Sequence, residues 1–182
     1  MKKMKKIFVL SLLTLLSLTS CGNNLNSYSK KINKSIKNAV EVVETLIIED
    51  GDVEVYKMVK TITLHYEDKL VSGIISTVEH NLSSNFTYVE STSSDTFEGE
   101  SNAVFSLNLN KDYFVDYSLT KGVLTGEVKK ESAKNFFNVE ALDCSTNPYV
   151  EIVLENKLLT SYSCSYLTTS EKEVSINVTY SY

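Results

Sequence analysis

The stretch VSINVTYSY, Val174 to Tyr182, alternates large apolar or aromatic residues with small polar ones. Successive side chains of a β-strand point to opposite faces of the sheet, so a period of two predicts a strand with one buried and one solvated face. Val174, Ile176, Val178, Tyr180 and Tyr182 are expected to face the core, and Ser175, Asn177, Thr179 and Ser181 to face water or a partner. Such a strand is typical of an antiparallel sheet.

Similar patterns precede this strand along most of the chain. Alternation, or enrichment in β-branched and aromatic residues, occurs over 53–66, 70–80, 103–109, 113–119, 149–155 and 158–168. Three short sequences between these patterns, YEDKL (66–70), LNKDY (109–113) and LENKL (154–158), each predict a hairpin turn. They form either a weak internal repeat or independent uses of the same turn chemistry. The chain is therefore expected to form a mostly antiparallel, twisted sheet built of hairpins.

Two other segments interrupt the strand pattern. The serine-, threonine- and acid-rich stretch 90–102 predicts a loop. Residues 129–143 space Ala133, Phe136 and Phe137 for a short helix, with Ser132 available as its cap, before a turn at Asn147 and Pro148.

The first part of the mature chain carries a helical pattern. Apolar residues recur at spacings of three and four at Ile32, Ile36, Ala39, Val40, Val43, Leu46 and Ile47, and the stretch around Gly51 predicts the helix end. We expect an α+β fold in which this amphipathic helix packs on the sheet. Its lysines, Lys30, Lys31, Lys34 and Lys37, are compatible with a solvated helix face or with an electrostatic contact to a membrane.

The first 20 residues have the pattern of an export signal. Four lysines precede the apolar run Ile7–Leu18, which is short for a bilayer-spanning helix, and the sequence Leu-Thr-Ser-Cys then ends at Cys21. This ending resembles the lipobox of bacterial lipoproteins, although serine stands at position 20, where glycine or alanine is more usual. The resemblance implies that Cys21 is lipidated and becomes the first mature residue, and that the protein is anchored to the extracytoplasmic face of the cell membrane.

The predicted organisation is a signal peptide over 1–20, a polar tether over 21–28 and a single α+β domain over 29–182. The mature chain has 14 lysines, no arginine and 23 acidic residues, a formal charge of −9. Phosphate neutralisation needs basic patches, so this balance argues against a nucleic-acid partner.

Cys144 and Cys164 remain once Cys21 is assigned to the lipid. An exported protein can keep a disulfide, so the pair is a candidate bridge. The alternative is two separate buried thiols that act as small apolar residues.

No catalytic or metal motif is found in the sequence, so we expect no cofactor and no enzymatic activity. The two histidines, His65 and His80, are expected to lie about 26 Å apart if the turn at Asp68 and Lys69 is tight, too far to share one ion. The carboxylates at positions 49, 50 and 52 are interpreted as turn formers at the helix end.

Two functions agree with these observations. The first is a surface lipoprotein that acts as a non-enzymatic binding or accessory module for a protein or glycan, with its tyrosines as candidate contacts. The alternative follows from element order, because a helix followed by a long antiparallel meander is similar to the half-barrel lipoprotein carriers. That resemblance implies a sheet that holds an acyl chain or other apolar ligand.

The lipid anchor gives the first prediction. Cys21→Ser should remove the acyl group and release the protein from membranes, or trap it as the precursor, because the lipobox resemblance assigns the lipid to the sulfur of Cys21. Fractionation with intact mass measurement checks this. A mutant that stays in the membrane with the acyl mass of the wild type would show that the signal is misread.

Overall fold

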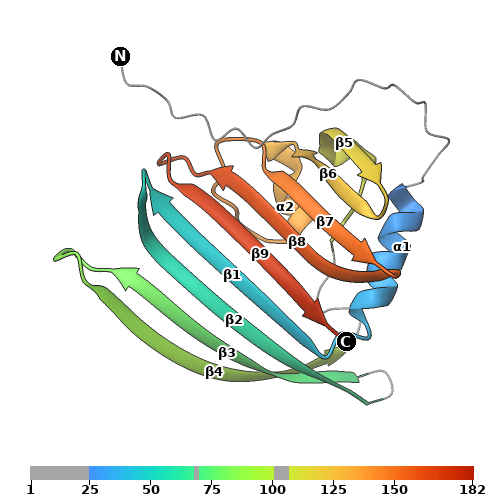
Figure 1. Ribbon diagram of the computed structural model, residues 1–182, viewed down its shortest axis with the longest axis horizontal. Coiled ribbons are helices and arrows are strands. Elements are labelled where there is room, and N and C mark those ends of the chain that lie inside the picture. The colour runs from blue at the N-terminus through green and yellow to red at the C-terminus, as the bar shows by residue number, and fades with distance from the viewer. Residues whose placement is uncertain (1–24, 68–69, 101–106) are drawn as a thin grey trace.

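The computed structural model describes residues 25–67, 70–100 and 107–182 (Figure 1). Within these ranges nine strands form a single open sheet in the order β4-β3-β2-β1-β9-β8-β7-β6-β5, and every neighbouring pair is antiparallel. The strands are β1 (Glu41–Asp50), β2 (Val53–Glu67), β3 (Leu70–Leu82), β4 (Tyr88–Glu100), β5 (Phe114–Thr120), β6 (Val123–Val128), β7 (Tyr149–Glu155), β8 (Leu158–Leu167) and β9 (Glu173–Ser181). The helices are α1 (Leu25–Ile36) and α2 (Ala133–Phe137), with short 3-10 turns at Lys111–Tyr113 and Lys130–Ser132.

The sheet consists of two meanders joined by the pairing of the first and last strands. β1 to β4 follow one another in space, as do β5 to β9, and β1 pairs with β9 over nearly its full length. The predicted antiparallel, hairpin-built sheet is therefore confirmed. We call the face of the sheet that carries α1, α2 and the core the inner face, and the opposite one the outer face.

Side-chain parity separates the two faces along β9 as the sequence predicts. Val174, Val178 and Tyr180 are buried and Ile176 is half-buried, whereas Ser175, Asn177, Thr179 and Ser181 are exposed. The register carries the same parity into β1 and β8, where Val42 and Cys164 are buried on the inner face. The core continues through Ile152, Leu124 and Phe136, all fully buried.

Next to a β-bulge near the start of β8, side chains from outside the strand form hydrogen bonds with its backbone. The register between β7 and β8 shifts after Val153, and β9 pairs with β8 only from Ser161 onward. The backbone of Leu159 is therefore left without a strand partner on the side of β9. Its N–H donates to Ser35 Oγ of α1 (2.7 Å), and its carbonyl accepts from Tyr182 Oη (2.8 Å).

The other end of α1 is held in the same way. Tyr28 Oη donates to the carbonyls of Ile152 (2.8 Å) and Gly122 (2.9 Å), the latter in the turn between β5 and β6. Gly122 has a φ of +89°, and a Cβ there would lie 2.5 Å from the carbonyl oxygen of Leu154, so glycine is required. Both contacts fix α1 against the bulge and the adjacent hairpins.

The structure corrects the extent of the predicted helix. α1 begins at Leu25, within the range expected for the tether, and ends at Ile36, while residues 41–50 form β1. Val43 lies on the outer face of β1, level with Thr179, instead of on a helix stripe. The apolar spacing was misleading because β1 carries β-branched residues on both faces, and Gly51 ends a strand in a hairpin turn at φ +67°.

Two further assignments are wrong. The polar stretch expected as a loop over 90–102 forms most of the edge strand β4 over its described part, because its backbone pairs with β3 although most of its side chains are exposed. The stretch 109–113 is not a hairpin turn but leads through a 3-10 turn into β5. The strand expected over 103–109 lies mainly outside the described residues, and its last three residues have no regular structure.

Other local predictions are confirmed. Asn156 and Lys157 form the β7–β8 hairpin turn, both with positive φ as a type I′ turn requires. β2 and β3 join in a two-residue connection, which pairs His65 with Ser72 as expected. The short helix after Ser132 is α2, although the Ser132 side chain makes no cap hydrogen bond.

The contact between α1 and the bulge gives the second prediction. Ser35→Ala should lower the free energy of unfolding by about 1–3 kcal/mol, because the buried N–H of Leu159 loses its acceptor. Urea denaturation checks this, with Ser27→Ala on the exposed side of the same helix as the matched control. Equal stability of the two variants would contradict the role given to Ser35.

Candidate functional site

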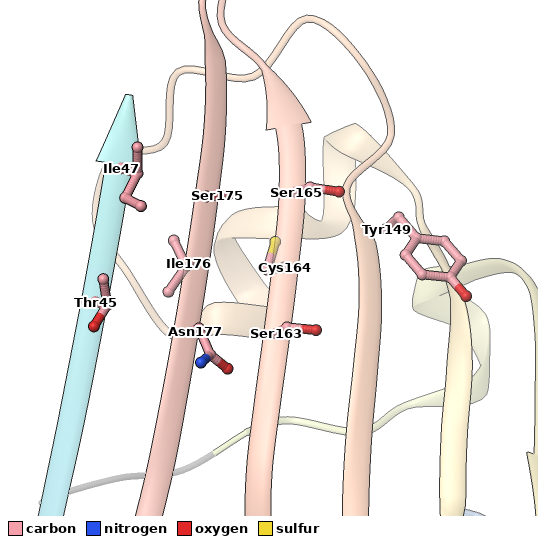
Figure 2. Close-up of a pocket in the computed structure, with 9 residues that line it drawn as sticks. All are labelled: Thr45, Ile47, Tyr149, Ser163, Cys164, Ser165, Ser175, Ile176 and Asn177. Carbon is pink, nitrogen blue, oxygen red and sulfur yellow. The ribbon is translucent and has the colours of Figure 1, made fainter. Parts of the chain in front are cut away.

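A groove of about 210 Å³ crosses the outer face of the sheet at β1, β9, β8 and β7 (Figure 2). It is lined by Thr45, Ile47, Tyr149, Ser163, Cys164, Ser165, Ser175, Ile176 and Asn177. In Figure 2 the strands lie side by side, with α2 behind them, so the groove opens away from the helices.

Strand register brings these residues together. One cross-strand row runs from Ile47 through Ser175 and Ser165 to Tyr149, and the next runs from Thr45 through Asn177 to Ser163. The central strands β9 and β8 contribute only serine and asparagine side chains to these rows, and the larger Ile47 and Tyr149 stand at the two ends of the first row. The groove therefore exists because serine and asparagine occupy the outer positions between an isoleucine and a tyrosine.

The chemistry of the groove is neutral and amphipathic. Its lining contains hydroxyl and amide groups that both donate and accept hydrogen bonds, together with the aliphatic side chain of Ile47 and the ring of Tyr149, which is 48% exposed. None of the lining residues is acidic or basic. Such a surface can hydrogen-bond a ligand and stack against its apolar side, but it has no group of its own for acid–base catalysis at neutral pH.

A second hollow, of about 370 Å³, lies on the outer face near the start of β3. It includes His65, Ser72 and Glu98, which the register places in one row across β2, β3 and β4. Ser72 stands between the other two, so His65 does not lie between a nucleophile and a carboxylate as a catalytic triad requires. Among the described residues no hydrogen bond joins the three, and no cluster of three metal-ligating side chains is present. His80 instead faces Glu90 across β3 and β4, with Nε2 3.3 Å from the carboxylate.

The two cysteines among the described residues lie in one region of the fold, and the structure draws no bond between them. Cys164 is 3% exposed on the inner face of β8, and burial raises the pKa of its thiol to about 12, with a smaller effect from Cys144. Cys144 is half-buried after α2, and burial also raises its pKa, with the charge of Asp143 adding to the effect. The disulfide between them stays a prediction, and Cys21 lies outside the described residues.

The tyrosines expected as contacts are divided between packing and hydrogen bonding. Tyr162, Tyr166 and Tyr180 lie on the inner face, and burial raises the pKa of each phenol. Tyr182 bonds Leu159, so its hydroxyl is used inside the fold. Tyr149, which the sequence did not single out, is the tyrosine of the groove. Its partner on β8, Ser165, belongs to the alternating polar residues that face outward. The position of the Tyr149 ring beside it follows only from the pairing of β7 with β8.

No described helix has the length and apolar character needed to cross a membrane.

No family model matches the sequence, and the comparison with curated proteins finds no match. Among solved structures, two redesigned beta barrels, mFAP0 and mFAP1, both bound to DFHBI, align with 79% and 82% of this chain and 98% of their own. Their sequence identities are 11% and 9%, and each TM-score is 0.23. The dehydratase domain from the CurF module of Curacin polyketide synthase covers 86% of this chain and 78% of its own, with 8% identity and a TM-score of 0.23. These scores are too low to assign a shared fold or a function.

Thiol reactivity gives the third prediction. In reduced, native protein near pH 8, alkylation should label Cys144 much faster than Cys164, because the thiolate is the nucleophile and Cys164 is both more buried and shifted to the higher pKa. Time-resolved mass spectrometry measures both rates. Equal rates would show that β8 opens readily, whereas no label on either residue in denatured, unreduced protein would show the bridge.

Proposed function

We propose that the chain is an extracytoplasmic lipoprotein, anchored through Cys21, whose domain is a non-enzymatic binding module. Its binding site is the outer-face groove, and its ligand is a neutral, hydroxyl-bearing molecule of the glycan class. The observation that carries the proposal is the row of small hydroxyl side chains between Ile47 and Tyr149 (Figure 2).

The composition of the groove supports this ligand class over others. Sugars present hydroxyl groups at their edges and C–H groups on their faces, which match serine and asparagine side chains and a tyrosine ring respectively. A phosphate ligand would need basic groups, and the lining has none. An acyl chain would leave the serine and asparagine side chains of the groove without hydrogen-bond partners, which costs free energy.

An apolar-ligand carrier is the second candidate. Leu46 and Met58 lie opposite each other on the inner face and are only half-buried, which favours a ligand on that face. The same face also carries an ion pair between Lys60 and Glu44 (3.9 Å), two residues further along the same two strands. Because these charges would have to be desolvated against an acyl chain, the inner face suits such a ligand less well than a polar one.

The groove gives the fourth prediction. On an array of surface glycans, the mature protein should bind a defined set of sugars, and Ser165→Arg should abolish the signal because its long side chain fills the groove. Tyr149→Ala should weaken binding about tenfold, in line with the loss of an aromatic contact. The matched control is Ser76→Arg, an exposed position on the outer face of β3 away from the groove, which should bind as the wild type does.

Unfolding midpoints of the two arginine variants should agree, which separates loss of the site from loss of the fold. Wild-type protein that binds no glycan, or Ser165→Arg protein that binds as well as the wild type, contradicts the proposal. A stoichiometric lipid in native mass spectra of the purified domain would favour the carrier instead.

A further inference from the structure

Helix α1 presents a basic surface in an otherwise acidic protein. Lys30, Lys31, Lys34 and Lys37 are all exposed, and the segment from Leu25 to Val40 contains no acidic residue. The salt bridges formed among the described residues involve none of these lysines. Their charges are therefore open to an external partner.

Two hairpin turns add basic residues beside this helix. Lys121 precedes Gly122, whose carbonyl accepts the Tyr28 hydroxyl of α1. Lys157 lies two residues before Leu159, whose N–H donates to Ser35 of the same helix. Both lysines are exposed, and both have a positive φ in their turns. Together with the four lysines named above, six of the 14 lysines of the mature chain lie on α1 or on turns that touch it. We call these six residues the basic face.

Two acidic residues adjoin the basic face along the chain. Glu155 ends β7 next to the turn of Lys157, and Glu41 begins β1 after α1. Each is a single carboxylate at the margin, and no ion pair joins either of them to a lysine of the face. With a formal charge of −9 for the mature chain, the basic face is a local exception to the sign of the protein.

We infer that the basic face docks the domain on anionic lipid headgroups. The inference rests on the proposed anchor, because Cys21 precedes Leu25 by four residues, which span at most about 14 Å. A lipid on Cys21 would thus hold the start of α1 within about two Debye lengths of the headgroups, since the Debye length is about 8 Å at physiological ionic strength. A lipid chain combined with a basic patch is the arrangement that gives stable, oriented membrane attachment.

Docking through this face also orients the groove. α1 lies at the end of β7 and β8 in Figure 1, whereas the groove opens on the outer face of those strands, near their other end at Tyr149 and Ser165. The basic face would therefore rest on the membrane while the groove stays accessible from outside the cell.

The test uses the mature chain from Gly22 to Tyr182 without its lipid, so that only the domain surface contributes. Flotation with phosphatidylcholine vesicles, with and without phosphatidylglycerol, measures the partition coefficient at low and high salt. We expect binding to the anionic vesicles alone, lost at high salt. The triple variant Lys30→Gln, Lys34→Gln and Lys37→Gln should lower the partition coefficient by tenfold or more, since each lysine near a charged membrane contributes about fivefold.

A triple variant with the same change in net charge is the matched control. Lys111→Gln, Lys130→Gln and Lys134→Gln remove three exposed lysines outside the basic face and should leave partitioning unchanged. Equal losses in both triple variants, or no preference of the wild type for anionic vesicles at low salt, would overturn the inference. Neither result bears on the glycan-array experiment, so this inference and the proposed binding function can fail separately.

Discussion

The hydrogen bond from the Leu159 N–H to Ser35 is the contact on which the arrangement of this domain depends. The pairing of β8 with β9 begins only at Ser161, next to a β-bulge in the pairing of β7 with β8. The backbone donor and acceptor of Leu159 are therefore left in the interior, where an unsatisfied group costs about 1–3 kcal/mol. Ser35 and Tyr182 satisfy that donor and that acceptor. Helix α1 is thereby fixed on one end of the C-terminal meander, with its apolar residues in the core and its lysines outward.

This placement divides the surface of the domain into regions with different chemistry. The helices and the segment before β5 pack on the inner face, so the outer face of β9 and β8 stays uncovered and presents its small polar residues. Buried positions of α1, such as Ile32, alternate with exposed lysines at helical spacing. One helix therefore both completes the core and supplies the charges of the basic face.

Much of the fold could be predicted from the sequence, because period-two patterns and turn residues act locally. The alternation in β9 and the turn at Asn156 and Lys157 are of this kind. β1 and β4 could not be predicted in the same way. Residues 41–50 carry apolar side chains on both faces and so fit a helical spacing as well as a strand. Residues 88–100 form a strand only because β3 offers a backbone edge.

The candidate site, like the fold, could be predicted only in part from the sequence. The polar parity of Ser175 and Asn177 could be predicted, and with it a solvated face of β9. The groove itself depends on pairings between residues far apart in the chain, β1 with β9 and β7 with β8, which bring Ile47 and Tyr149 to its two ends. No local pattern specifies those pairings, so the residues that bound the groove became visible only in the structure.

The most direct measurement of this account is the hydrogen exchange rate of the Leu159 amide, observed residue by residue by NMR. If the Leu159 N–H donates to Ser35 in solution, this amide should be protected from exchange as strongly as the paired amides of the neighbouring strands. Its exchange rate should then be close to the limit set by global unfolding. Exchange as fast as that of an exposed loop amide would show that α1 is not held on the bulge, and would contradict the placement of α1 from which the basic face follows.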